Sequence, residues 1–182
     1  NFSANSIGAY LRAKGHQTSI IQCVPTEEAE FEDIEDIIFI PISNGQLDLI
    51  AEHCQDADVV GISILTTHYL RNARRITEHL RDKLNCSIIW GGVPIVAEPD
   101  LYLQYVDYVC VGEGEAALDE FVRHTVSGSP IDSVHGIAYR DTTGAIRRCR
   151  PVPLLEGGKL PLPLFDSSNH YILGHDLTSL SD

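Results

Sequence analysis

The sequence predicts an α/β fold built on a flavodoxin-like, doubly wound parallel sheet. Three short apolar runs, at residues 59–65, 87–92 and 108–115, each stop at glycine or serine. Two of them lead directly into sequence with helical spacing, as successive strands of a parallel sheet do. The carboxyl ends of such strands form the ligand crevice, so small residues there leave room for a large, flat molecule close to the backbone.

Helices and strands alternate along the chain. Helical spacing covers residues 5–14 and ends at Gly15, and residues 17–21 then have the pattern of a short strand. The alternation continues with a helix over 46–55, a strand over 58–64, a helix over 68–83, a strand over 87–90, a loop with Pro94 and Pro99, a short helix near 100–104, a strand over 107–111 and a helix over 115–126. In the strand order 2-1-3-4-5 the first strand precedes the first helix, so we expect a further strand ahead of Asn1.

The pattern changes after the break at Ser127–Pro130. Residues 136–140 and 145–150 flank a turn and predict a β-hairpin, and four prolines between 151 and 163 indicate a linker. The helical sequence that begins at once at Asn1 and the absence of methionine indicate an excerpt of a longer protein. We expect a ligand-binding domain over 1–128, a hairpin and proline linker over 129–160, and a linker over 161–182 toward a domain outside this sequence.

The net charge and the spacing of the cysteines argue against several classes of binding partner and metal site. A net charge of −13 repels nucleic acid and anionic lipid surfaces. The five cysteines form no C-x-x-C pair, which favours reduced thiols in the cytoplasm over disulfides, zinc or an iron–sulfur cluster. No apolar stretch approaches the ~18 residues of a membrane helix. Residues 27–36 hold seven acids and predict a solvated loop or helix face.

Two predicted strand ends lie side by side in this fold. Ser63 lies at the end of one predicted strand and presents a hydroxyl there, and Gly91 and Gly92 lie at the end of the next strand. Glycine and serine also terminate strands that bind nothing, but together with the strand end at Gly112 they favour a slot for a long, mostly uncharged tail inserted between strands.

Ser63-x-Leu65, Gly91-Gly92 and Val111-Gly112-Glu113-Gly114-Glu115 carry a family resemblance. With them, the chain resembles the cobalamin-binding domain of cobalamin-dependent radical S-adenosylmethionine enzymes, in the Mg-protoporphyrin monomethyl ester cyclase-like group. The resemblance implies a corrin lying across the strand ends, with its nucleotide tail in the slot and acidic side chains meeting its amide and ribose donors. The cofactor-binding residues it implies are Ser63, Ile64, Leu65, Thr66, Thr67, His68, Gly91, Gly92, Val93, Gly112, Glu113, Gly114 and Glu115.

Two elements found in relatives are missing. Residues 1–15 contain no Asp-x-His-x-x-Gly loop, so the resemblance implies that no histidine replaces the displaced base of the cofactor. His68 is the one histidine placed to approach the ligand, and we interpret it as a helix-surface or capping residue. The three-cysteine cluster motif is also missing, so S-adenosylmethionine and a [4Fe-4S] cluster are expected only in a missing carboxyl-terminal radical domain of the same chain. We expect this fragment to be non-catalytic alone, with a small-molecule substrate for the whole enzyme.

Two other classes share parts of the pattern. Gly112-x-Gly114-x-x-Ala117 matches the dinucleotide fingerprint of an NAD-dependent oxidoreductase, but Glu113 and Glu115 put carboxylates where a pyrophosphate needs bare amides. A stand-alone receiver-like module shares the strand order, but Ser63 and Gly112 occupy the positions where it needs an acid and a lysine.

Overall fold

The computed structural model describes residues 2–23, 41–153, 155, 160–163 and 169–181. The acidic segment at 27–36 lies outside the described residues. No helix in the described part of the chain is both long and apolar enough to cross a membrane. The elements are α1 (Phe2–Ala13), β1 (Ile20–Cys23), α3 (Asn44–His53), β2 (Val59–Ser63), η1 (Thr67–Tyr69), α4 (Leu70–Lys83), β3 (Ser87–Gly91), α5 (Val93–Ala97), α6 (Pro99–Tyr102), β4 (Tyr108–Cys110), α7 (Gly114–Ser127), η2 (Ile131–Ser133), β5 (Ile137–Arg140), β6 (Ile146–Arg148), β7 (His170–Leu173) and β8 (Leu177–Ser179).

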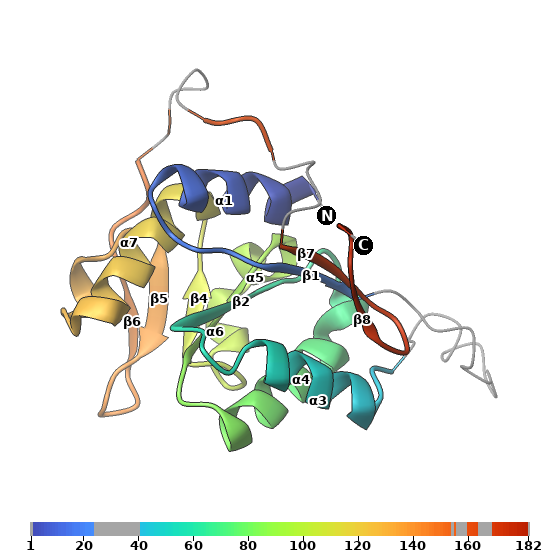
Figure 1. The fold of residues 1–182 in the computed structure, drawn as a ribbon. Helices are drawn as coiled ribbons and strands as arrows, with labels where there is room; N and C mark the ends of the chain where they lie inside the picture. Colours follow the sequence, from blue (N-terminus) through green and yellow to red (C-terminus); the bar gives the residue numbers. More distant parts are fainter. Residues whose placement is uncertain (1, 24–40, 154, 156–159, 164–168, 182) are drawn as a thin grey trace.

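The main sheet has five strands in the order β2-β3-β4-β5-β6 (Figure 1). β2, β3 and β4 are parallel, and the predicted hairpin, β5 and β6, extends the sheet in the antiparallel sense. The parallel strands joined by helices confirm the predicted α/β class, since only crossover connections can join parallel neighbours. The register sets Ser63 opposite Gly91.

A second, smaller sheet joins both ends of the chain. β1 pairs in parallel with β7, and β7 pairs antiparallel with β8. The sequence predicts the strand at Ile20 but gives it a place in the main sheet, and it predicts only a linker over 161–182. β7 and β8 form there because Tyr171, Ile172 and Leu173 make a short apolar, strand-favouring run that an open strand can pair with.

Helices cover both faces of the strands. α1 packs against α7 on one side, and α3 packs against α4 on the other (Figure 1). The core between them contains fully buried Trp90, whose indole N–H donates to the hydroxyl of buried Thr77 at 2.8 Å. This buried pair anchors β3 to α4, because an unpaired indole N–H in the core is costly.

The helices form where the spacing predicts them, with one exception. α3 begins with a reciprocal capping box, in which Ser43 and Gln46 each satisfy the backbone amide of the other. The exception is α5, which occupies part of the predicted loop after β3. Pro94 is compatible with this helix because it lies in the first turn, where its missing N–H has no helical partner to lose.

Candidate functional site

The carboxyl ends of β2, β3 and β4 meet at one edge of the main sheet because the three strands are parallel and adjacent. The amide of Ile64 donates to the carbonyl of Gly91 at 2.8 Å, which extends the pairing of β2 and β3 by one residue. The structure therefore brings together Ser63, Gly91 and Gly92, as the sequence predicts.

Gly91 and Gly92 have different physical roles. Gly92 has φ +114°, and a Cβ added to it would lie 2.0 Å from the carbonyl oxygen of Ile64. Only glycine allows the backbone after β3 to approach the end of β2 so closely. A Cβ on Gly91 would lie an ordinary 3.6 Å from the Cβ of Cys110. The tight contact at Gly92 is thus made by the protein itself and leaves no empty slot at that atom.

Large apolar side chains are exposed after both β2 and β3. Leu65 is 62% exposed and Val93 is 70% exposed, and Tyr69 and Val96 stand exposed in the following turns. Leu65 and Val93 are among the binding residues that the resemblance implies, whereas Tyr69 and Val96 are exposed residues outside that set. Helical spacing alone does not reveal exposure at the first turn of a helix. Exposed apolar groups gathered at one edge favour a ligand with an apolar surface.

In the segment at the end of β2, one side chain is buried in the core and several others are exposed to solvent. The side chain of Ile64 is buried in the core, so Ile64 can reach a ligand only through its backbone. Ser63, Thr66, Thr67 and His68 are exposed. The hydroxyl of Thr66 lies 3.3 Å from Nδ1 of His68, as in a local turn contact. His68 is thus an exposed residue of η1, as the surface interpretation predicts, and no side chain forms a capping hydrogen bond at the start of η1.

The loop after β4 divides into an open half and a packed half. Gly112, with φ +114°, and Glu113 are exposed, and no atom lies within 4 Å of a Cβ built on Gly112. A Cβ on Gly114 would lie 2.8 Å from Cδ1 of Ile7 in α1. The carboxylate of Glu115 is buried and accepts a 2.7 Å hydrogen bond from Ser6. Gly114 and Glu115 therefore serve the contact between α1 and α7, and Glu113 is the carboxylate open to a ligand.

The thiol of Cys110, next to this loop, has low reactivity. Burial, together with the nearby carboxylates of Glu115 and Glu113, raises the pKa of Cys110 to about 12. All five cysteines of the chain are free. Since only the thiolate is a strong nucleophile or metal ligand, Cys110 contributes small size and packing to this edge rather than reactivity.

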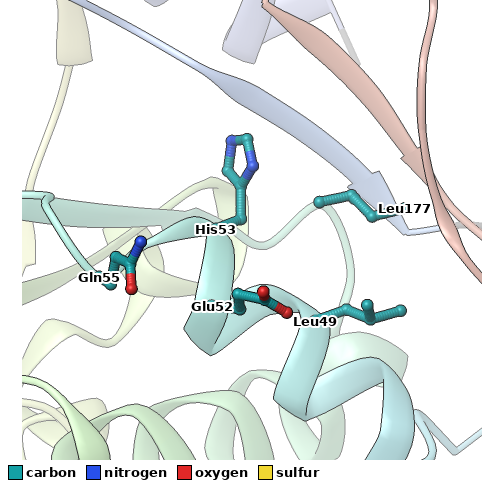
Figure 2. A pocket seen from close by; sticks show the side chains of 5 residues that line it. All are labelled: Leu49, Glu52, His53, Gln55 and Leu177. Carbon is teal, nitrogen blue, oxygen red and sulfur yellow. The ribbon is translucent and has the colours of Figure 1, made fainter.

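Two hollows lie apart from these strand ends. One, of about 400 Å³, is lined by the end of α3 and by Leu177 of β8, and Figure 2 shows the side chain of His53 beside it. His53 Nε2 lies 2.7 Å from the hydroxyl of Ser19, and burial lowers the pKa of this histidine. The other is on the hairpin, lined by Asp132, Tyr139, Asp141, Arg147, Arg148 and Cys149. None of the predicted binding residues lines either hollow.

Comparison with known proteins gives a family match and several relatives. The model of the B12 binding domain matches residues 1–122. The anaerobic magnesium-protoporphyrin IX monomethyl ester cyclase of Synechocystis is 26% identical over 179 residues, which cover 96% of this chain and 31% of the cyclase.

Two solved structures share the fold. One is the cobalamin-dependent S-adenosylmethionine radical enzyme OxsB with aqua-cobalamin and S-adenosylmethionine bound, with TM-score 0.66, 20% identity, and coverage of 90% of this chain and 21% of OxsB. The other is the radical S-adenosylmethionine methyltransferase TsrM from Kitasatospora setae with cobalamin and a [4Fe-4S] cluster bound, with TM-score 0.61, 16% identity, and coverage of 88% of this chain and 28% of TsrM. The chain spans less than a third of each of these proteins.

Proposed function

We propose that this chain, which belongs to the B12-binding domain family, holds cobalamin across the carboxyl ends of β2, β3 and β4. The observation that carries this location is that exposed Leu65 and Val93 and the small residues Gly91 and Gly112 all lie at the carboxyl ends of these three strands. A flat corrin can cover the apolar side chains and lie close to the backbone where side chains are absent.

The residues at this edge fit the chemistry of the cofactor. Cobalamin carries amide side chains, and Glu113 is an exposed carboxylate that accepts hydrogen bonds from amide N–H groups. The hydroxyls of Ser63 and Thr66 add donors and acceptors at the carboxyl end of β2. Cobalamin supplies organometallic cobalt chemistry when bound, and the residues of this chain bind and orient it.

We further propose that the chain is the cobalamin domain of a longer radical S-adenosylmethionine enzyme. Support comes from the cyclase relative, of which the chain covers 31%, and from the likeness to OxsB and TsrM. S-adenosylmethionine and the [4Fe-4S] cluster would then be held by another domain of the same chain, which acts on a small-molecule substrate by methyl transfer or radical tetrapyrrole chemistry. The five free thiols support a reducing, cytoplasmic compartment.

The geometry gives less support to the dinucleotide alternative. Gly114 lies against Ile7, and Glu115 is hydrogen-bonded to Ser6, so the start of α7 is covered by α1. A pyrophosphate needs those first-turn amides open, without a buried carboxylate beside them. Enhancement of nicotinamide fluorescence on mixing would nevertheless favour the oxidoreductase over the cobalamin domain.

The cobalamin location is tested by spectroscopy with matched charge variants. Hydroxocobalamin mixed with the protein should co-elute on gel filtration with a shifted visible spectrum. Leu65→Asp puts a charge under the corrin and should abolish co-elution. Val126→Asp is the control, because Val126 is also 62% exposed but lies in the last turn of α7. Cobalamin that elutes freely from the unmodified protein would contradict binding, and equal losses in both variants would contradict the location.

A further inference from the structure

Cys54 and Cys86 approach the same part of the core from two different elements. Cys54 follows the last turn of α3, and Cys86 directly precedes β3. Side chains of a strand alternate between the two faces of a sheet, so Cys86 shares a face with Ile88 and Trp90. Residues of α3 and α4 cover that face, and both cysteines pack against the buried cluster beneath them. The two thiols therefore lie at one margin of the core.

A tight turn holds the backbones of the two cysteines at the same end of the sheet. The amide of Ala57 donates to the carbonyl of Cys54 at 3.0 Å, and the amide of Ser87 donates to the carbonyl of Asp58 at 3.1 Å. A turn closed by such a bond keeps its first and fourth Cα atoms within about 7 Å. Cys54 is thus one turn away from Asp58, and Asp58 is paired with the residue after Cys86.

The two thiols also affect each other electrostatically. Burial, together with the charge of a Cys86 thiolate, raises the pKa of Cys54 to about 11, and burial raises the pKa of Cys86. A like charge has such an effect only from a short distance. No cysteine contributes to the raised pKa values of Cys23, Cys110 and Cys149. Among the five cysteines, all of which the structure describes, Cys54 and Cys86 are therefore the pair in which one thiol acts on the other.

We propose that Cys54 and Cys86 form a reversible disulfide when the protein meets a disulfide oxidant such as oxidised glutathione. The thiolate of Cys86, the less buried of the two, attacks one sulfur of the oxidant and releases one glutathione thiolate. The thiolate of Cys54 then attacks the Cys86 sulfur, which forms the internal disulfide and releases the second glutathione. The two protein thiols lose two protons and two electrons, and the oxidant takes up both and becomes two thiols.

The disulfide ties the end of α3 to the start of β3. α3 also connects the two sheets, because Gln46 donates to the carbonyl of Gly174 at 2.9 Å and Nε2 of His53 lies 2.7 Å from the hydroxyl of Ser19. Oxidation therefore restrains the helix on which the small sheet packs. Cys86 precedes the amino end of β3, so the bond forms at the edge opposite the proposed cofactor site, and the inference does not rest on that proposal.

Mass spectrometry of the oxidised protein tests the disulfide without cobalamin. The protein is incubated with oxidised glutathione, its remaining thiols are alkylated, and it is digested without reduction. We expect a cross-linked peptide that joins Cys54 to Cys86, a loss of two hydrogen atoms from the intact mass, and a higher urea midpoint, all reversed by dithiothreitol. Cys54→Ser should abolish the cross-link and leave glutathione on Cys86. Cys149→Ser is the matched control, because Cys149 is also half-buried and its loss should leave the cross-link intact.

The outcomes distinguish this pair from a chance reaction of thiols. A cross-link that forms in the folded protein and disappears in Cys54→Ser and Cys86→Ser, but not in Cys149→Ser, supports the proposal. Cys54 and Cys86 left unmodified, or carrying glutathione without an internal bond, would overturn it. Other pairings in equal yield, or a cross-link that forms only in urea, would overturn it as well, because the fold would then not bring the two thiols together.

Discussion

Shortening Leu65 to alanine should weaken cobalamin binding without altering the fold. Burying a whole leucine side chain is worth roughly 2 kcal/mol. Leu65 is 62% exposed, so a corrin that covers it gains about 1 kcal/mol from this residue. Loss of that contact corresponds to about a fivefold increase in Kd. Val93→Ala should have a similar effect, and the two changes together about 25-fold if they act independently.

The assay is a titration of the visible spectrum of hydroxocobalamin with each variant. Val126→Ala is the matched control, since Val126 is equally exposed but distant from the strand ends. Thermal unfolding of all variants should agree within experimental error, because the removed groups face solvent without cofactor. An unchanged Kd for Leu65→Ala and Val93→Ala, or an equal increase for Val126→Ala, would refute the location of the corrin.

Five other substitutions, in two pairs and one single change, separate residues that we propose bind the ligand from residues that pack the fold. Gly92→Ala should lower stability by at least about 2 kcal/mol in denaturant unfolding, from strain at φ +114° and the clash with Ile64, whereas Gly91→Ala should cost less. Equal losses of stability in the Gly91 and Gly92 variants would contradict this expectation, because the backbone at residue 92 would then have moved away from Ile64. Glu113→Gln should weaken cobalamin binding and leave stability unchanged, whereas Glu115→Gln should chiefly loosen α1, since its carboxylate accepts from Ser6; the reverse pattern would contradict this division of the loop. Thr77→Val leaves the indole N–H of Trp90 unpaired and should cost about 1–3 kcal/mol, and a neutral urea midpoint would argue against that hydrogen bond.

Local sequence signals predict the helices and strands well where the pattern is long. The spacing of Ala73, Ile76 and Leu80 predicts α4, and all three face the core or its margin. α5 is missed because Pro94 indicates a loop, and a short helix with proline in its first turn has the same local pattern. The linker expected over 161–182 misses β7, because pairing with β1 depends on a residue 150 positions earlier in the chain.

The sequence by itself determines the class of the fold and predicts the edge at which we propose that the ligand binds. Apolar runs that end in Ser63, Gly91–Gly92 and Gly112 specify parallel strands with small residues at their carboxyl ends, and both features depend on local composition. Only the tertiary structure decides what each small or acidic residue does there. A side chain at Gly92 would clash with the carbonyl of Ile64, and one at Gly114 would clash with the side chain of Ile7. A Cβ at Gly112 would meet no atom within 4 Å. The physical reason is that close approach and burial are set by elements distant in sequence, and a glycine's local pattern is the same whether it meets a ligand, a backbone or a helix.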